Sequence, residues 1–323
     1  MACALIRRPP HIPLDRITVT CHSLGMQPRV STRSFSRRSF LLTSLAAAGG
    51  AAAWARGAEA ERGIQIGVCR PWSDHAALKG YGFDFSEDSV GKLLAPGQAD
   101  EVFAKTRDAF KTSGPLLPVR SCNGFYPGEL KLVGPDADLE KAVAWADTAA
   151  RRAAQLGLTC IVLGSGGPRK IPDGFARAKA EEQFIALGKR LGERAQAHGI
   201  VIAVESLNSS ETNFLNKLGE VIALVDAVGS PGFQAVADFY HMAREDEGPD
   251  LVRKAGERIR HCHIAEKEKR TAPGTAGDDF RPYFKALKDI GYAGGISCEC
   301  GWKDFQAQAA GAVQLLRRQW AEA

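Results

Sequence analysis

The sequence predicts an α/β fold: a (β/α)8 TIM barrel that forms a single domain after an N-terminal signal segment. Three observations favour this fold. Short apolar, mostly β-branched runs recur eight times after residue 60, helical patterns lie between most of them, and the eight units fill the ~250 residues typical of this barrel. We expect residues 61–323 to form the barrel domain and residues 1–60 to form the N-terminal extension.

The eight apolar runs predict the strands of the barrel. Several of them are bounded by Gly or Pro, which is typical of strands. The runs cover residues 64–69, 83–87, 117–122, 159–163, 200–205, 233–238, 259–264 and 295–300.

Helical periodicity between the runs predicts the outer layer. The clearest helix begins at Asp136 or Asp138, either of which is a suitable N-cap, and stops at Gly157. Three further helices are predicted: one ends at Gly199, one ends at Gly229, and one begins at Asp304. An open doubly wound sheet is the competing arrangement, but the turn after the first run lacks the Gly-rich phosphate loop usual there.

Four successive predicted strands each end in a potential metal ligand. Glu205 and Asp238 are the last residues of their runs, and His263 and Glu299 lie one residue from the ends of theirs. Because the carboxyl ends of all barrel strands open on one mouth, we expect these side chains to converge. Three carboxylates and an imidazole would repel one another and desolvate poorly without a cation. The donor set predicts one divalent metal ion, with Mn²⁺ first and Mg²⁺, Co²⁺ or Zn²⁺ as alternatives.

Strand alternation separates ligands from thiols in "RHCHIAEK" and "SCECGW". His261 and His263 share one face of their strand, and Cys262 takes the other. Glu299 likewise faces away from its two neighbouring cysteines. Neither stretch is therefore a three-ligand cluster, and we expect His261 to be a hydrogen-bonded residue of the barrel interior.

The cysteines of the predicted barrel are interpreted as reduced core residues. Two of the eight cysteines in the chain precede the signal, and the other six lie in short apolar runs. A free cysteine behaves as a small buried hydrophobe, and we expect these six to point outward beneath the helices. They are Cys69, Cys122, Cys160, Cys262, Cys298 and Cys300.

The N-terminal segment predicts export. Arg37 and Arg38 precede a weakly apolar stretch, 41–55, that is shorter than the ~20 residues of a membrane span. Small residues at 58–60 follow at cleavage spacing, so we expect the twin-arginine translocase as a partner, cleavage after Ala60, a periplasmic location and no stable membrane anchor. A disordered, Ala-rich basic tail is the alternative, and translation could begin at Met1 or Met26.

The charge of the chain is concentrated in that segment. Residues 1–60 hold eight Arg or Lys and two Asp or Glu, whereas residues 61–323 hold 34 and 35. A near-neutral barrel without a basic stripe argues against a nucleic-acid partner.

At the four strand ends the chain resembles the xylose-isomerase-like barrel family, especially its sugar and sugar-phosphate isomerases and epimerases of the ketose 3-epimerase type. The resemblance covers about 64–320 and is carried by "VESLNSSETNF", "ADFYHM", "HIAEKEK" and "SCECGW". It implies that the four strand-end residues bind the metal and that four others contact a sugar: Asn208, Glu211, His241 and Lys269. Lys269 stands where ketose 3-epimerases carry arginine, which keeps the charge but loses the bidentate fork.

The resemblance implies an isomerase that moves a proton next to a carbonyl. The metal would stabilise the enediolate, while Glu205 and Glu299 would remove and return the proton. A metal-dependent lyase or dehydratase acting on oxidised (keto) sugars or glycosides would need the same groups and is the main alternative. An abasic-site endonuclease relative is disfavoured because the extra strand-end histidines are missing, and a non-catalytic sugar-binding protein would not need both glutamates.

Two stretches near the predicted mouth have two interpretations each. The "GSGG" at 164–167 is either an anion-binding nest or a flexible turn, and Trp302 either stacks on a sugar or closes the barrel rim. The sequence leaves open the sugar, its phosphorylation, and the oligomeric state, a homo-oligomer included.

Overall fold

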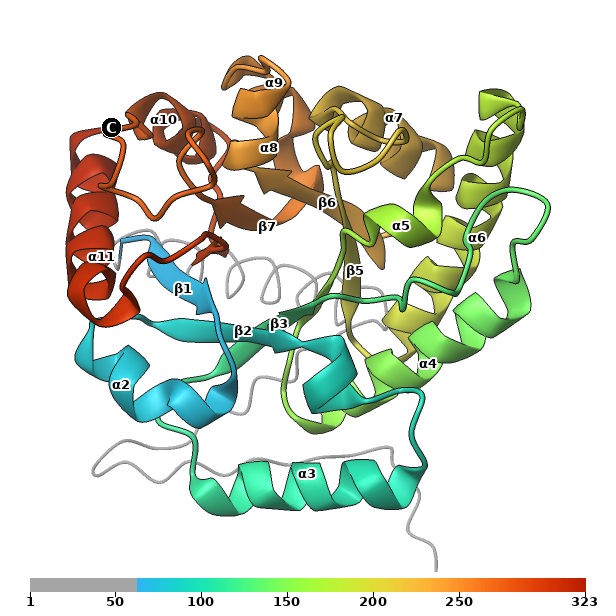
Figure 1. Cartoon of the computed structure of the whole chain (residues 1–323), viewed down its shortest axis with the longest axis horizontal. Coiled ribbons are helices and arrows are strands. Elements are labelled where there is room, and N and C mark those ends of the chain that lie inside the picture. Colours follow the sequence, from blue (N-terminus) through green and yellow to red (C-terminus); the bar gives the residue numbers. More distant parts are fainter. Residues whose placement is uncertain (1–62) are drawn as a thin grey trace, which may run out of the picture. The chain divides into compact units, whose positions relative to one another are not determined.

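Eight parallel strands close into a barrel surrounded by helices in the computed structural model, which describes residues 63–323 (Figure 1). Each strand pairs with its neighbours in sequence, and β1 closes the ring by pairing with β8. The strands are β1 (Gln65–Cys69), β2 (Phe85–Ser89), β3 (Val119–Asn123), β4 (Cys160–Leu163), β5 (Val201–Glu205), β6 (Phe233–Asp238), β7 (Ile259–Ile264) and β8 (Gly295–Cys298). The predicted TIM barrel is confirmed, whereas the signal segment and the domain boundary at residue 60 lie outside the described residues.

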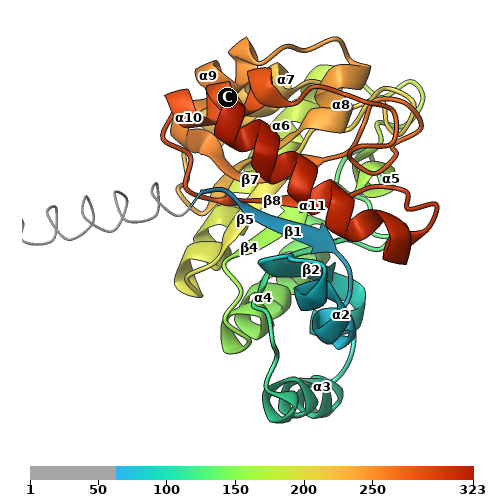
Figure 2. The same cartoon turned by 90° about the vertical axis from the view of Figure 1, so that its left-hand side faces the viewer.

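The helices lie outside the strands in the two views of Figures 1 and 2. Their predicted ends are recognisable in the structure: Asp138 and Asp304 cap α4 and α11 with their carboxylates, and Gly229 ends α7 in the left-handed region. The helices are η1 (Trp72–Asp74), α2 (His75–Gly80), the π-helix η2 (Val90–Leu94), α3 (Asp100–Ser113), α4 (Leu139–Gln155), α5 (Gly166–Arg169), α6 (Arg177–Ala197), α7 (Leu218–Val228), α8 (Phe239–Arg244), α9 (Asp250–Ala255), η3 (Gly256–Arg258), α10 (Arg281–Asp289) and α11 (Phe305–Glu322).

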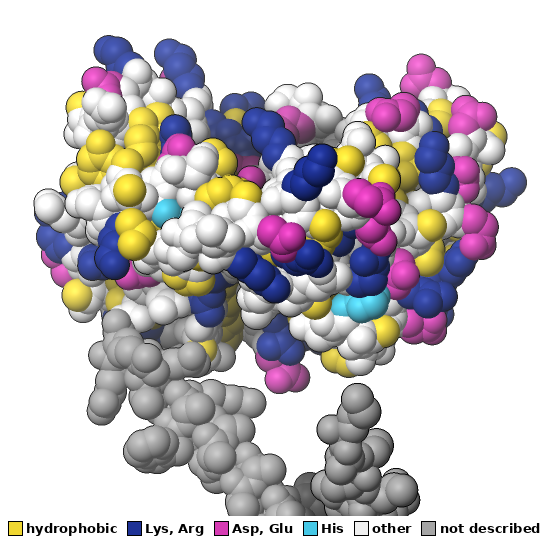
Figure 3. Space-filling view, turned by 90° about the horizontal axis from the view of Figure 1, so that it is seen from below, with side chains coloured by type: hydrophobic (Ala, Val, Ile, Leu, Met, Phe, Trp, Pro, Cys, Tyr) yellow, Lys and Arg dark blue, Asp and Glu magenta, His cyan; other side chains and the backbone are white. Residues whose placement is uncertain are grey.

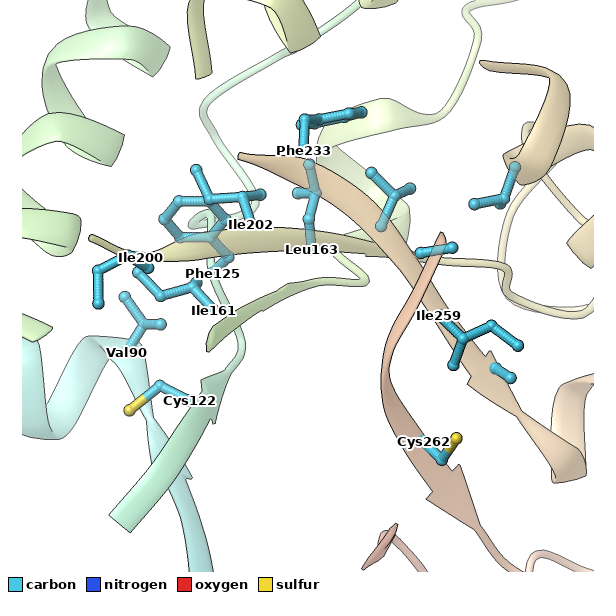
Figure 4. Packing of buried hydrophobic residues seen from close by; sticks show 14 of the residues in the cluster. Val90, Cys122, Phe125, Ile161, Leu163, Ile200, Ile202, Phe233, Ile259 and Cys262 are labelled. Carbon is cyan, nitrogen blue, oxygen red and sulfur yellow. The ribbon is translucent and has the colours of Figure 1, made fainter. Parts of the chain in front are cut away.

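The main hydrophobic core lies between the strands and the helices. Outward-facing residues of most strands belong to it, among them Ile161, Leu163, Ile202 and Phe233 (Figure 4). The barrel interior contains a separate and smaller apolar group on the side of β4, β5 and β6, formed by Cys160, Val162, Ala203 and Val236. The interior near β2 and β7 contains the polar side chains of Glu87, Ser121, His261 and Ser297 beside Phe85, and this region leads to the site described below.

All six cysteines of the barrel are free, but the structure corrects the predicted orientation of two of them. Cys122, Cys262 and Cys298 belong to the outer core as expected. Cys160 faces inward because Ile161 and Leu163 take the outward positions of β4. Cys69 also faces inward, with its Sγ close to carboxylate and imidazole atoms of the barrel interior.

The barrel surface carries charges of both signs. On the face shown in Figure 3, Lys and Arg side chains are interspersed with Asp and Glu rather than gathered by sign. Among the described residues, no helix has the combined length and apolarity needed to cross a bilayer.

Candidate active site

Four side chains from four neighbouring strands meet at one end of the barrel. Glu205 and Asp238 end β5 and β6, His263 lies near the end of β7, and Glu299 directly follows β8. One donor atom from each of the four lies within 4.8 Å of the donor atoms of the other three. The structure thus brings together all four residues that the sequence singled out as metal ligands.

The Nδ1 atom of His263 lies at the centre of this group. It is 2.6 Å from Glu205 Oε1, 3.1 Å from Glu299 Oε2 and 3.9 Å from Asp238 Oδ2. Three of the four residues are buried, and the Glu299 side chain keeps 24% of its surface exposed. The cluster is therefore shielded on the barrel side and accessible beside Glu299.

The environment moves the pKa values of the two glutamates in opposite directions. Burial raises the pKa of Glu205 and also that of Asp238. Burial acts in the same direction on Glu299, but the neighbouring His263 and Arg270 outweigh it and lower its pKa to about 2. For His263, the carboxylates of Glu87, Glu299 and Glu205 outweigh the effect of burial and raise the pKa well above its ordinary value.

Asp238 shows that the group fits a cation. Its Oδ1 accepts hydrogen bonds from the backbone N–H groups of Tyr240, at 2.7 Å, and His241, at 3.1 Å. Its Oδ2 is buried and has no hydrogen-bond partner among the residues that the structure describes. A buried carboxylate oxygen without a partner costs free energy, and a bound cation would remove that cost. Three carboxylates and one imidazole are a donor set that suits a divalent metal ion.

Three of the predicted sugar-contacting residues form a hydrogen-bonded group beside the acids. The backbone N–H of Asn208 donates to His241 Nδ1 at 3.1 Å, and the Asn208 amide lies 2.9 Å from that atom and 3.0 Å from Glu211 Oε1. Nδ1 of His241 accepts a hydrogen bond, so the ring hydrogen of the neutral imidazole is on Nε2. This buried nitrogen lies 3.6 Å from Asp238 Oδ2. Burial also lowers the pKa of His241, which favours this neutral form.

The structure places the fourth predicted residue, Lys269, outside this group. Its side chain is 83% exposed, and its Nζ lies 3.5 Å from Glu268 Oε1. The next residue, Arg270, enters the site instead. Its guanidinium pairs with Glu299 Oε2 and lies 3.6 Å from Glu211 Oε1. An arginine fork is thus present, one position later than the resemblance implied.

The path of the loop after β7 explains this offset. Lys269 and Arg270 both have a φ of 54°, so the chain turns through two left-handed residues at this point. Glu266 is buried and accepts hydrogen bonds from the backbone N–H groups of Gly274, at 2.8 Å, and Gly277, at 3.1 Å. The sequence does contain an indication of this arginine fork, because an arginine directly follows Lys269.

Of the two features with two interpretations, the "GSGG" stretch lies beside one of the acids. Gly164 approaches Glu205 so closely that a Cβ on this glycine would lie 2.6 Å from Glu205 Oε2. Arg169, the last residue of α5, follows this stretch. It is buried and donates hydrogen bonds to the backbone carbonyls of Leu163 and Leu215. The segment therefore packs against the site. Trp302 packs edge-on against Phe305, with ring centroids 4.9 Å apart.

Two polar residues lie deeper in the barrel than the four ligands. His261 is buried, and its Nε2 lies 2.6 Å from Glu87 Oε2, so it is the hydrogen-bonded interior residue that we expected. Glu87 ends the second predicted strand, but the sequence pattern suggested no role for it.

Comparison with curated proteins finds sugar epimerases. An L-ribulose 3-epimerase of Methylomonas sp. is 39% identical over 127 residues, which are 39% of this chain and 44% of the relative. A D-psicose 3-epimerase of Enterocloster bolteae is 34% identical over 112 residues, which are 34% of this chain and 37% of the relative. The matched region is therefore less than half the length of either relative.

Comparison with solved structures, and with a family profile, covers more of the chain. The crystal structure of a D-allulose 3-epimerase from Methylomonas sp. in complex with D-allulose has a TM-score of 0.63 at 25% identity, over 80% of this chain and 97% of that one. The 3-keto-D-glucoside 4-epimerase YcjR from E. coli shares the fold, with a TM-score of 0.68 at 20% identity over 79% of this chain and 99% of that one. The profile described as xylose isomerase-like TIM barrel matches residues 76–319. The chain therefore belongs to the xylose isomerase-like TIM barrel family.

Proposed function

We propose that this protein is a divalent-metal-dependent sugar isomerase or epimerase that transfers a proton through an enediolate. The observation that carries the proposal is the pair of glutamates beside one imidazole, with carboxylate oxygens 2.6 and 3.1 Å from His263 Nδ1. Two carboxylates at one small site can remove a proton from a substrate carbon and return it. The epimerases among the similar proteins support this reaction class.

We assign each residue a role in metal binding or proton transfer from its surroundings. Glu205, Asp238, His263 and Glu299 would hold the ion, which would supply positive charge for the oxyanion of the enediolate. The lowered pKa of Glu299 keeps this carboxylate ionised, and the Asn123 amide at 3.0 Å and Arg270 hold it in place, so we assign it the first proton removal. Glu205, whose pKa is raised by burial, is the better proton donor to the opposite face. His241 Nε2–H has no hydrogen-bond partner among the described residues, so we assign it, together with the Arg270 guanidinium that pairs with Glu299, to binding substrate oxygens.

Glu299→Gln tests the proton-transfer role. The amide keeps an oxygen donor, so part of the metal is expected to stay, but it cannot accept a proton. Turnover of ketoses or keto-glycosides should fall at least ~10²–10⁴-fold, the usual effect of losing a general base. Solvent-deuterium exchange at the substrate carbon, followed by NMR at measured metal occupancy, reads this out.

The same experiment distinguishes the alternatives. A metal-loaded Glu299→Gln protein that exchanged and turned over like the wild type would exclude the two-glutamate mechanism. Release of water or of an aglycone, rather than an isomeric sugar, would identify a lyase or dehydratase. We expect Mn²⁺ to support the highest rate, with Mg²⁺, Co²⁺ and Zn²⁺ as the other ions to compare.

We also propose that the chain is exported through the twin-arginine route. The support is the order of basic residues, weakly apolar stretch and small residues before Glu61. Replacing Arg37 and Arg38 with lysine should retain the protein in the cytoplasm, as measured by cell fractionation. Unchanged periplasmic accumulation of that variant would contradict the proposal.

A further inference from the structure

Glu87 is a buried carboxylate that reaches across the barrel. It lies on β2 and is 1% exposed. β1 and β8 separate β2 from β7 around the ring, so the two strands are not paired. Nevertheless, the Glu87 carboxylate contacts two side chains of β7, His261 and His263. These contacts therefore pass through the barrel interior.

Both oxygens of Glu87 are occupied by donors. Oε2 accepts hydrogen bonds from Ser121 Oγ at 2.8 Å and Ser297 Oγ at 2.9 Å, and it lies 2.6 Å from His261 Nε2. Oε1 has a single described partner, His263 Nε2, at 3.0 Å. An ionised carboxylate only accepts hydrogen bonds, so the His263 nitrogen that faces Glu87 at hydrogen-bond distance carries a hydrogen atom.

This contact decides what the other nitrogen of His263 can do. A neutral imidazole has one N–H and one lone pair. Without an ion, Nδ1 also faces a carboxylate, Glu205 Oε1 at 2.6 Å, and the doubly protonated ring satisfies both contacts. An ion held among Glu205, Asp238 and Glu299 requires the lone pair of Nδ1, and Glu87 then keeps the remaining hydrogen on Nε2. The contact with Glu87 also restricts the orientation of the His263 ring, because Nε2 faces Glu87 while Nδ1 faces the other three carboxylates.

We infer that Glu87 is a positioning residue that holds His263 in its Nε2–H tautomer and aims Nδ1 at a divalent ion. The inference rests on the metal site of the proposed function. A carboxylate behind a metal-binding histidine commonly orients the ring and strengthens the ligand, and its loss typically costs 10–100-fold in metal affinity.

A purely structural role for Glu87 is the competing explanation. A barrel interior does not require an acid, and the half formed by β4, β5 and β6 is filled by apolar side chains and Cys160. Buried ionic groups are often replaceable by hydrophobic ones without loss of stability. If the role of Glu87 were only to fill space and accept hydrogen bonds from the two serines, replacing its carboxylate would change folding stability but not metal affinity.

Glu87→Gln separates the two explanations. Its amide NH2, placed at the Oε1 position, would donate to His263 Nε2 and favour a proton on Nδ1, where the ion should bind. We expect the Kd for Mn²⁺, titrated into the metal-free full-length chain, to rise 10–100-fold. Ser121→Ala is the matched control, because it removes a donor to Oε2 and leaves the contact between Oε1 and His263, so its Kd should stay near that of the wild type.

Two measurements keep the test independent of folding and of activity. The metal-free thermal midpoint of Glu87→Gln should fall no further than that of Ser121→Ala. In the wild type, ¹⁵N NMR of the imidazole should show His263 protonated on Nε2 in the neutral form. A wild-type Kd for Glu87→Gln, a loss equal to that of the control, or an Nδ1–H tautomer in the wild type would overturn the inference.

The outcomes also separate this inference from the proposed function. A wild-type chain that binds Mn²⁺ but turns over no sugar, with weakened binding in Glu87→Gln, would keep the inference and reject the sugar chemistry. A wild-type chain that binds no divalent ion would reject both.

Discussion

The guanidinium of Arg270 connects the candidate metal site with the candidate sugar site. It pairs with Glu299, lies 3.6 Å from Glu211 Oε1 and 3.9 Å from Asp238 Oδ2, and sits 5.0 Å from the centroid of the Tyr240 ring. A planar fork that is stacked on an aromatic ring has few conformations to lose when it binds an oxygen. Lysine at this position could supply the charge but not the fork.

Replacing Arg270 with alanine should therefore change both rate and pH dependence. Loss of a charged hydrogen-bond donor, at about 1.5–3 kcal/mol, predicts a kcat/KM that is roughly 10–100-fold lower. Because Arg270 helps to keep the Glu299 pKa at about 2, its removal should raise that pKa and move the acid limb of the pH–rate profile to higher pH. Steady-state kinetics across pH measure both effects.

Lys269→Ala is the control for this prediction. Its exposed side chain contacts only Glu268 among the charged groups described, so kcat/KM and the acid limb should remain unchanged. A larger effect of Lys269→Ala than of Arg270→Ala would show that the loop reaches the substrate by another path.

Among the elements, the turn from β4 into α5 passes close to Glu205, one of the two glutamates proposed to move the proton. Gly164 has no side chain, and this absence gives Glu205 the space for its Oε2. Gly167, three residues later, has nothing within 4 Å of the position of a Cβ. The two glycines thus form a natural pair for comparing the effect of one methyl group.

Gly164→Ala should reduce metal affinity and turnover while leaving the fold intact. The new methyl group would require Glu205 to move, since a 2.6 Å contact is shorter than real Cβ atoms tolerate. For the ligand and proton donor that we propose, a displacement of about 1 Å can cost on the order of 10²-fold in rate. Metal titration and kinetics of Gly164→Ala beside Gly167→Ala measure this, and equal behaviour of the two variants would contradict it.

At the scale of elements, the residues at the strand ends could be predicted from sequence. Side chains alternate along a strand, and the strand–helix unit repeats at a regular length, and these two patterns determine the positions. Glu205, Asp238 and His263 lie where their apolar runs placed them, and the barrel closes by repeating one unit. Arg270 could not be predicted in the same way, since its position depends on a loop that Glu266 holds through distant backbone groups. The partners of Glu87 lie across the barrel, so no local pattern on β2 indicates them.

In the whole molecule, protonation would compete with the proposed ion for the same atoms. The pKa of His263 is raised, so its folded-state contribution is present at low pH and is lost as pH rises through the folded pKa. The ion needs the deprotonated ring, and the raised pKa values of Glu205 and Asp238 act in the same direction. We therefore expect binding of the proposed ion to release protons.

The thermal stabilisation by Mn²⁺ should accordingly be larger at about pH 8 than at about pH 6. Release of one proton predicts roughly tenfold tighter binding per pH unit below the His263 pKa. Calorimetric titration in buffers of different ionisation enthalpy counts the released protons. A pH-independent Kd would show that His263 is already deprotonated in the metal-free protein.

The thiol state of the whole barrel is a further prediction. Six cysteines are free, and burial raises the pKa of Cys160, Cys262 and Cys298 to about 12, which keeps these thiols unreactive. Thiol titration of residues 61–323 in denaturant without reductant should therefore find about six groups. Two or more disulfides would contradict the assignment of these residues to the core.

Asp238 uses its two oxygens for two different purposes, since one caps α8 and the other faces the metal position. Helix order and ion affinity are therefore linked, and such linkage is reciprocal: whatever stabilises the first turn of α8 must tighten the ion by the same factor as the ion stabilises the turn. The first turn of this helix carries His241, a candidate sugar contact. If the proposed ion and sugar both bind here, we expect each to strengthen the binding of the other through this turn.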